Sequence, residues 1–233
     1  MHVLYDMNLE NSVVLVTGSS SGIGRETAIK FSEEGSKVVV TYNQGKERGE
    51  EVLEMCRENS EVMLVRLDVT DKESIRDAVE KIVEEFGQID LLVNNAGILK
   101  SGFLEELDFK EIEEQLEVNL EGLIQTTKII LPQLKKGERG MVINIASGLG
   151  KRGSSEVSIY CATKFGVRGF TQALAEELSP EIEVYVVNPG MTATPMTDHK
   201  GEDPEKVAEV ILKTAQEKLG KRPGQDIDVS KHI

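Results

Sequence analysis

Three residues in the second half of the chain have types and a spacing suited to proton transfer. Tyr160 follows Ser147 by thirteen residues, and Lys164 follows Tyr160 by four. A separation of four residues puts two side chains on one face of a helix. A phenol ordinarily has a pKa near about 10, and a close ammonium lowers it. We therefore expect Ser147 to hold a carbonyl oxygen while Tyr160, its pKa lowered by Lys164, delivers a proton to that oxygen.

The Tyr-x-x-x-Lys spacing is not specific by itself, because Tyr42 and Lys46 repeat it. At the earlier pair, Gly45 and a predicted strand end interrupt any helix. A purely structural interpretation of the later pair also exists: Tyr160 would be a half-buried helix residue and Lys164 a surface cation. A second motif is needed to favour chemistry.

That second motif is a glycine turn, TGSSSGIG at residues 17–24, which follows an apolar run. Glycines let the backbone turn tightly and approach a phosphate, and the amides at the start of a helix face an anion. The serines add hydroxyl donors. The turn predicts a dinucleotide site at the following residues: Gly18, Ser20, Ser21, Gly22, Ile23 and Gly24.

Two other interpretations of this turn compete with the dinucleotide site. It could be an ordinary strand-to-helix turn, and residues 18–22 also match the G-x-S-x-G pattern of hydrolases. A hydrolase needs a histidine later in the chain, and the available ones are His199 in a polar stretch and His232 next to the end. We therefore favour the dinucleotide site.

The surrounding elements should place both motifs at one edge of a sheet. Apolar, β-branched runs predict strands at 13–17, 37–42, 62–67, 89–93, 141–146 and 183–187, and residues 225–229 are a candidate for a last strand. Helices are expected at 22–35, 46–58, 71–86, 109–136, 158–178 and 204–219, with Thr70 capping the third and an end or interruption of the fourth near Pro132. Continuous apolar strands alternating with helices are typical of an α/β fold: a doubly wound parallel β-sheet of about seven strands, with helices on both faces, Rossmann-type.

Composition excludes several classes of protein. The 233 residues suit one domain, 1–233, in which residues 1–11 form an N-terminal extension. The 41 acidic and 27 basic residues give a net charge of −14, which argues against nucleic-acid partners. Apolar runs are too short for a membrane span. Two cysteines without metal-ligand spacing, and no visible signal peptide, predict a cytoplasmic protein without a metal site.

Further motifs follow successive strands, and with them the sequence resembles the compact, single-domain branch of the short-chain dehydrogenase/reductase family over nearly its whole length. They are Asp68-Val69, Asn94-Asn95-Ala96-Gly97, Asn119, and Asn188-Pro189-Gly190 with Thr194. The branch includes 3-oxoacyl-acyl-carrier-protein reductases and related carbonyl reductases.

The resemblance implies a catalytic set of Asn119, Ser147, Tyr160 and Lys164, in which Asn119 holds a water of a proton relay. It also implies that Asp68 and Val69 contact adenine, and that Asn95, Ala96 and Gly97 line the adenosine side. Tyr160 and Lys164 would bind the nicotinamide end of the coenzyme. Its carboxamide would be framed by Pro189, Gly190, Thr192 and Thr194.

The coenzyme expected is NADP(H), with NAD(H) possible. An NAD site usually carries an acidic residue about 20 residues beyond the glycines, whereas residues 41–45 contain none. Thr41 and Asn43 are expected to hydrogen-bond a 2′-phosphate, and Lys46 and Arg48 to reach it.

The substrate expected is a small carbonyl compound or the corresponding secondary alcohol, and a 3-oxoacyl thioester is the specific alternative. A non-catalytic dinucleotide sensor is a remote alternative, because such proteins typically lose the tyrosine or lysine. Two departures from the family are a short substrate lid, 191–203, and a C-terminus without a glycine-rich tail. By resemblance, a homo-oligomer (dimer or tetramer) is expected through residues 109–136 and 158–178.

Overall fold

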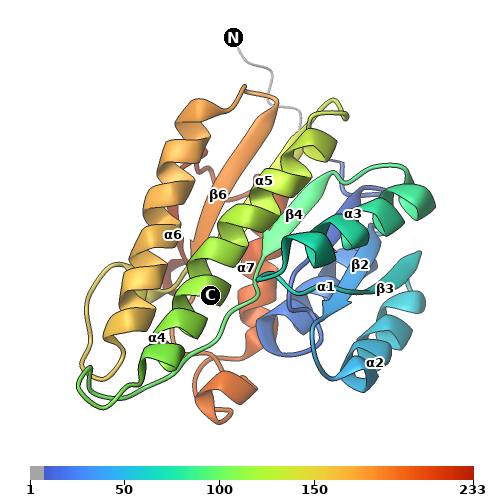
Figure 1. Ribbon diagram of the computed structural model, residues 1–233. Helices are drawn as coiled ribbons and strands as arrows, with labels where there is room; N and C mark the ends of the chain where they lie inside the picture. The colour runs from blue at the N-terminus through green and yellow to red at the C-terminus, as the bar shows by residue number, and fades with distance from the viewer. Residues whose placement is uncertain (1–7) are drawn as a thin grey trace.

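A computed structural model describes residues 8–233; residues 1–7 of the expected N-terminal extension lie outside the described residues. Seven strands form one parallel sheet in the order β3-β2-β1-β4-β5-β6-β7 (Figure 1). The strands are β1 Val13–Val16, β2 Lys37–Tyr42, β3 Val62–Arg66, β4 Leu91–Asn94, β5 Gly140–Ile145, β6 Ile182–Asn188 and β7 Asp226–Asp228. The expected fold class is confirmed.

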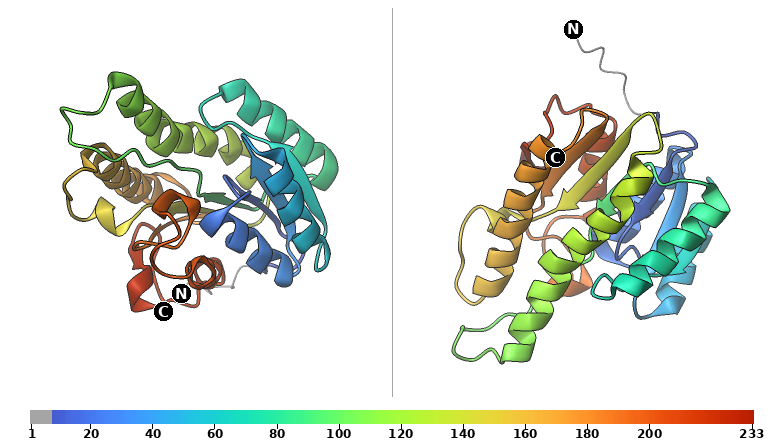
Figure 2. Two further views of the ribbon diagram at one scale, coloured as in Figure 1. Left: turned by 90° about the horizontal axis from the view of Figure 1, so that it is seen from below. Right: turned by 45° about the horizontal axis from the view of Figure 1, so that its top comes forward.

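Helices cover both faces of the sheet, as Figure 2 shows. They are α1 Gly22–Glu33, α2 Lys46–Arg57, α3 Lys72–Phe86, α4 Phe109–Leu116, α5 Gly122–Leu134, α6 Ser158–Glu177 and α7 Pro204–Ala215. Short helical turns are η1 Glu117–Glu121, η2 Gly148–Gly150, η3 Pro195–Thr197 and η4 Val229–Lys231. Helices α1, α2 and α7 lie on one face, and α3, α5 and α6 lie on the other.

The strands contribute side chains to two hydrophobic cores, one on each face of the sheet, because successive side chains point to opposite faces. In β1, Val14 and Val16 pack with Phe31 of α1, while Val13 and Leu15 belong to the core with α3 and α5. All four β1 residues are buried. This two-sided burial is why the strand sequences read as continuous apolar runs.

The strand order reverses between β1 and β4, which lie side by side although β2 and β3 separate them in the sequence. At such a reversal the connections leave in opposite directions and open a crevice at the carboxyl ends of the strands. The glycine turn follows β1 and the Asn95 motif follows β4, so the fold brings both to this crevice.

One sequence-based detail is wrong: the third helix is capped by Asp71, whose carboxylate accepts from Glu73 N, while the Thr70 hydroxyl bonds Asp68 instead. The expected helix end near Pro132 is confirmed, since α5 ends at Leu134. The segment 109–134 is also irregular earlier, at the π-helical turn η1.

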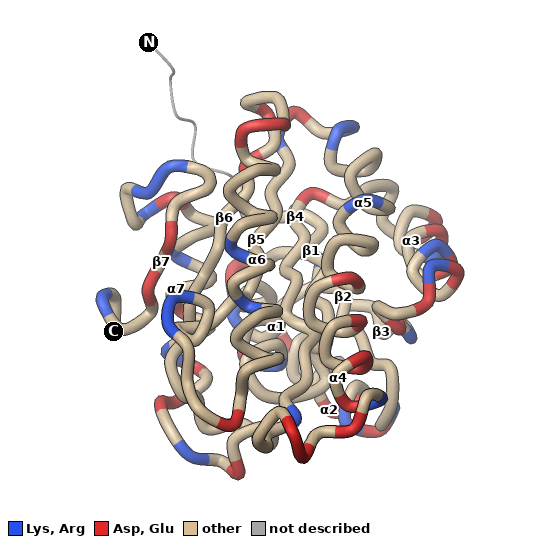
Figure 3. The backbone as a smooth tube through the Cα atoms, turned by 60° about the vertical axis from the view of Figure 1, so that its left-hand side comes forward, with Lys and Arg blue, Asp and Glu red and all other residues tan. Residues whose placement is uncertain are grey.

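The described part of the N-terminal extension is held in place rather than loose. Leu9 is buried in the core beside α1, and its carbonyl accepts from the hydroxyl of Ser36. Among residues 8–233, no helix is both long and apolar enough to cross a lipid bilayer. Along the backbone, basic positions are interspersed with acidic ones (Figure 3).

A buried ionic cluster lies at the amino ends of β5 and β6, opposite the crevice. Arg139 donates to Glu217 at 2.9 and 3.1 Å and to Glu183 at 2.8 Å. Burial is the largest cause that raises the pKa of Glu183 above its ordinary value of 4.5, and the adjacent Glu217 raises it further. Arg139 acts in the opposite direction. The low dielectric of the site thus outweighs one shared guanidinium.

This cluster predicts a pH-dependent stability. A carboxyl whose pKa is raised in the folded state stabilises the fold fully below its unfolded pKa, and that contribution is lost as pH rises through the folded pKa. From about pH 4.5 to pH 8, we therefore expect the free energy of unfolding of wild type to fall more than that of Glu183→Gln, by on the order of 1 kcal/mol. Urea denaturation at intervals of pH measures this difference. Glu209→Gln, at an exposed pair with Lys213, is the control, and parallel wild-type and Glu183→Gln curves would contradict the prediction.

Candidate active site

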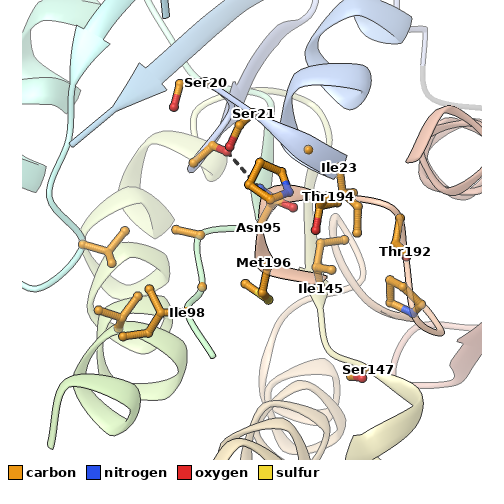
Figure 4. Close-up of a pocket in the computed structure, with 18 of the residues that line it drawn as sticks. Ser20, Ser21, Ile23, Asn95, Ile98, Ile145, Ser147, Thr192, Thr194 and Met196 are labelled. Atoms are coloured by element: carbon orange, nitrogen blue, oxygen red, sulfur yellow. Dashed lines mark hydrogen bonds between the residues drawn. The ribbon is translucent and has the colours of Figure 1, made fainter. Parts of the chain in front are cut away.

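The crevice contains a cavity of about 610 Å³. Figure 4 shows Ser20, Ser21 and Ile23 on one side of it, with Thr194 and Met196 close by and Ser147 at the far end. Eighteen of the sequence-predicted site residues line the cavity: Gly18, Ser20, Ser21, Gly22, Ile23, Asn43, Asp68, Val69, Asn95, Ala96, Gly97, Ser147, Tyr160, Lys164, Pro189, Gly190, Thr192 and Thr194. Of the described residues, Gly24, Lys46 and Asn119 are predicted site residues outside this lining.

Buried hydroxyl groups fix the glycine turn. Gly18 N donates to Thr41 Oγ1 at 3.0 Å, and Thr41 N donates to Ser19 Oγ at 2.8 Å. Thr41 Oγ1 also donates to Val16 O at 2.9 Å. Thr41 is fully buried by these contacts, so the expectation that it would bond a 2′-phosphate is wrong. Its role is to tie the end of β2 to the turn.

The turn lies directly against the loop that follows β4. A Cβ on Gly18 would be 3.0 Å from Ala96 Cα, and one on Gly24 would collide with the Asn95 amide and lie 2.6 Å from Gly18 O. Gly24 is therefore needed for packing, although it does not line the cavity. Asn95 Nδ2 donates to Thr17 O at 2.9 Å, which joins the two loops.

The start of α1 can accept an anion. Its N-cap residue, Ser21, makes no side-chain capping bond within the described chain, and its first turn contains no acidic residue. The first amides of a helix need an acceptor, and the helix dipole favours a negative one. Gly22, with a φ of 57°, presents this backbone to the cavity.

A basic residue that the sequence did not indicate, Arg66, lies behind the cavity wall and bonds Asn43, which lines the cavity. Tyr42 pairs with Arg66 in the register of β2 and β3, and Arg66 Nη2 donates to Asn43 Oδ1 at 3.3 Å. Lys46 points elsewhere: its ammonium pairs with Glu50 at 3.0 Å. The sequence did not indicate this contact because Arg66 lies 23 residues from Asn43, and only the pairing register of β2 and β3 brings the two together.

Ser147, Tyr160 and Lys164 line the cavity together, at the end where Figure 4 shows Ser147. Lys164, only 4% exposed, donates from Nζ to Ile145 O at 2.9 Å, and its ammonium lies 5.6 Å from the centroid of the Tyr160 ring. Ser147 follows β5 and accepts from Leu149 N at 3.1 Å, which leaves its own proton to donate to Tyr160 or to a ligand.

The electrostatics of this group differ from the expectation. Burial raises the pKa of Tyr160 above 10.0, while a hydrogen bond with Ser147 acts in the opposite direction. Burial also lowers the pKa of Lys164 from 10.5 to about 8. The expected lowering of the Tyr160 pKa by Lys164 is therefore not found, because desolvation of both groups is the larger effect in the protein without coenzyme.

Asn119 lies in the π-helical turn η1, one layer behind the cavity wall. Its Oδ1 accepts from Ile98 N at 2.7 Å, and its Nδ2 donates to Ile98 O at 2.8 Å. A Cβ on Gly97 would be 3.2 Å from Asn119 Oδ1 and 3.8 Å from Lys164 Nζ. Asn119 and Lys164 thus approach the same glycine from two helices.

Residues 191–203 form a short loop that bonds to itself. Ala193 N donates to Glu202 O at 2.7 Å, and Glu202 N donates to Met191 O at 2.9 Å. A Cβ on Gly22 would be 3.0 Å from Thr194 Cγ2, so the loop lies against the glycine turn. Its η3 turn adds Pro195, Met196 and Thr197 to the cavity lining.

Comparisons with known proteins agree with this site. The family model described as short chain dehydrogenase matches residues 12–205. The 3-oxoacyl-(acyl-carrier-protein) reductase of Thermotoga maritima is 34% identical over 96% of this chain and 98% of its own. A short chain dehydrogenase from Burkholderia cenocepacia in complex with NADP has a TM-score of 0.88 at 30% identity, covering 95% of this chain and 97% of its own. Levodione reductase has a TM-score of 0.87 at 26% identity, covering 94% of this chain and 96% of its own.

The family model matches most of the chain, and serine, tyrosine and lysine lie together at the cavity. These two findings exclude the hydrolase interpretation of the glycine turn. This chain belongs to the short-chain dehydrogenase/reductase family and is an NAD(P)-dependent oxidoreductase.

Proposed function

We propose that this enzyme interconverts a small carbonyl compound and its secondary alcohol with NADP(H), using Tyr160 as the general acid and base. The observation that carries the proposal is the meeting of Tyr160, Ser147 and Lys164 in the cavity that the glycine turn also lines. A proton donor and an anion-binding turn in one cavity are what coupled hydride and proton transfer requires.

The residues present fit the coenzyme. The open amides at the start of α1 would hold its pyrophosphate, and Asp68 and Val69 would contact the adenine, with Asn95 to Gly97 beside the adenosine. Pro189, Gly190, Thr192 and Thr194 would frame the nicotinamide carboxamide. When bound, the coenzyme supplies or accepts the hydride. The 191–203 loop would act as the substrate lid, since it lies over the glycine turn and adds apolar Met196 to the cavity.

Each catalytic side chain then has one task in reduction. The Ser147 hydroxyl donates to the carbonyl oxygen, and the Tyr160 hydroxyl gives its proton to that oxygen as it becomes an alkoxide. The raised pKa keeps Tyr160 protonated at neutral pH, which suits a proton donor. Lys164, with a pKa of about 8, can pass a proton near neutral pH, and Asn119 would hold the water that supplies it.

Replacing the proposed proton donor tests this function. We expect Tyr160→Phe to lower kcat by roughly 10²- to 10⁴-fold, the usual contribution of a general acid, with little effect on coenzyme binding. Oxidation of NADPH in the presence of ketones, diketones and acetoacetyl thioesters measures kcat, and fluorescence titration measures binding. Tyr42→Phe is a matched control because it has the same spacing to a lysine. Undiminished turnover by Tyr160→Phe would refute the assignment.

The same substrate panel separates the specific alternative from the general one. The Thermotoga maritima relative is named a 3-oxoacyl-(acyl-carrier-protein) reductase, and acetoacetyl thioesters are included to test whether this chain shares such an activity. Preference for them over simple ketones would identify a thioester reductase. Tight NADPH binding without turnover of any carbonyl compound would instead favour a dinucleotide sensor.

Coenzyme preference depends on the positive charge near Asn43. We expect Arg66→Met to weaken NADPH binding about tenfold, the loss of roughly one charge-assisted contact, and to leave NADH binding nearly unchanged. Arg57→Met, at the other end of α2 in an exposed pair with Glu54, is the control. Equal losses for both coenzymes would contradict a phosphate contact, and better catalysis with NADH in wild type would exclude the NADP(H) preference.

We also propose a cytoplasmic homo-oligomer. Both cysteines are free and buried, as in a reducing compartment. Large apolar side chains are exposed on the adjacent helices α4 and α6: Phe109 at 83%, Leu116 at 40% and Phe165 at 44%. Apolar groups gathered in this way are typical of protein interfaces.

A charge placed in this surface should separate the subunits. Phe109→Asp is expected to shift the mass in solution towards the monomer, because an ionised carboxylate buried in an apolar interface is strongly unfavourable. Light scattering after size-exclusion chromatography measures the mass. Met55→Asp, on α2 at 40% exposure, is the control. A monomeric wild type would overturn the proposed assembly.

A further inference from the structure

An ion pair outside the catalytic set joins α6 to the edge strand β7. Arg168 Nε donates to Asp226 Oδ1 at 2.7 Å, and Arg168 Nη2 donates to Asp226 Oδ2 at 2.5 Å. The two side chains are 17% and 22% exposed. Two parallel bonds from a planar guanidinium fix the orientation of both groups, which a single lysine ammonium could not do. In Figure 3, β7 lies at the edge of the sheet beside β6.

The remaining donor of Arg168 reaches the turn that begins at Ser147. Arg168 Nη1 donates to Gly150 O at 2.6 Å, and Gly150 N donates back to Ser147 O at 2.9 Å. The turn also lies directly on α6, since a Cβ on Gly150 would be 2.7 Å from Lys164 O. Arg168 is one helical turn beyond Lys164, so a single helix face carries the lysine and the group that holds the serine turn.

The carboxylate continues these contacts to the segment before the 191–203 loop. Asp226 Oδ1 accepts from Asn188 Nδ2 at 2.9 Å, and Gly148 N donates to Pro189 O at 2.8 Å. The bonds therefore close a ring that runs from the serine turn through Arg168, Asp226 and the 188–189 segment back to the serine turn. The backbone of Ser147 and Gly148 is part of this ring.

We propose that Arg168 and Asp226 are positioning residues that hold the Ser147 hydroxyl against Tyr160 and the carbonyl oxygen of the substrate. The proposal rests on the proposed function for its catalytic consequence. Ser147 sits on an irregular turn after β5, and small displacements of a catalytic group are costly to the rate. The competing explanation is that the pair merely fastens β7 to the sheet.

A neighbouring ion pair separates these two explanations. Lys151 Nζ donates to Asp228 at 2.8 and 3.0 Å, so it also fastens β7, but it has no bond to the Gly150 carbonyl within residues 8–233. Lys151 directly follows the turn, and its ammonium also lies 3.9 Å from Asp226. Arg168→Met and Lys151→Met thus each remove one attachment of β7, but only Arg168→Met removes the bond to the Gly150 carbonyl. Lys151→Met is therefore a matched control.

The first measurement does not depend on turnover. The protein is labelled with tyrosine carrying ¹³C at Cζ, and Tyr160, assigned by its loss in Tyr160→Phe, is titrated by NMR. Because Ser147 bonds the phenol, we expect Arg168→Met to titrate Tyr160 at a higher pH than wild type, in the direction given by Ser147→Ala. Lys151→Met should titrate as wild type does. Identical titrations for Arg168→Met and Lys151→Met would overturn the proposal.

The second measurement is kinetic. It uses the ketone, diketone or acetoacetyl thioester that the wild-type enzyme reduces. We expect Arg168→Met to lower kcat about 10- to 100-fold, with KM for coenzyme nearly unchanged, and Arg168→Lys not to restore it. Asp226→Asn, which keeps the shape of the side chain, should lower kcat in the same direction and serves if Arg168→Met does not fold. Unchanged kcat in folded Asp226→Asn and Arg168→Lys would refute the positioning role. Wild type without any turnover would refute the proposed function alone, because the Tyr160 titration would still decide this inference.

Discussion

The close approach of two loops at the point where the strand order reverses is the constraint on which the rest of the site depends. The turn after β1 and the loop after β4 touch backbone to backbone, and Gly18 and Gly24 leave no room for a side chain between them. Buried hydroxyls from Thr17 and Thr41 occupy the polar groups that this contact would otherwise leave unpaired. The start of α1 is thereby fixed relative to the loop that follows β4.

At the other end of the cavity, burial governs the chemistry. Desolvation disfavours the charged form of both titrating groups, so it raises the pKa of Tyr160 and lowers that of Lys164. A bare ammonium 5.6 Å from the ring does not reverse this. The protein alone therefore holds a protonated phenol beside a lysine that gives up its proton easily. That arrangement agrees with the proposed role of Tyr160 as a proton donor.

Much of this arrangement was predictable from the sequence because it follows from local rules. Continuous apolar runs identified six of the seven strands, and a spacing of four residues put Tyr160 and Lys164 on one helix face. The predictions that failed concern contacts between residues far apart in the sequence. The position of Arg66 beside Asn43 comes from the register of β2 and β3, and the direction of the Tyr160 shift comes from the balance of burial against a partner several ångströms away. The hydroxyl of Thr41 is used in hydrogen bonds to the backbone at Val16 and Gly18. The sequence of residues 41–45 does not indicate these bonds.

The short last strand, β7, depends on ion pairs made by its side chains. The last strand has three residues and pairs with β6 on one side, so backbone bonds alone hold it weakly. Its two aspartates, Asp226 and Asp228, supply what the short ladder lacks by pairing with Arg168 and Lys151. Because Arg168 also bonds the Gly150 carbonyl, the attachment of β7 and the position of the turn that begins at Ser147 depend on one side chain. A short edge strand that does not line the cavity is thus connected to a turn that does.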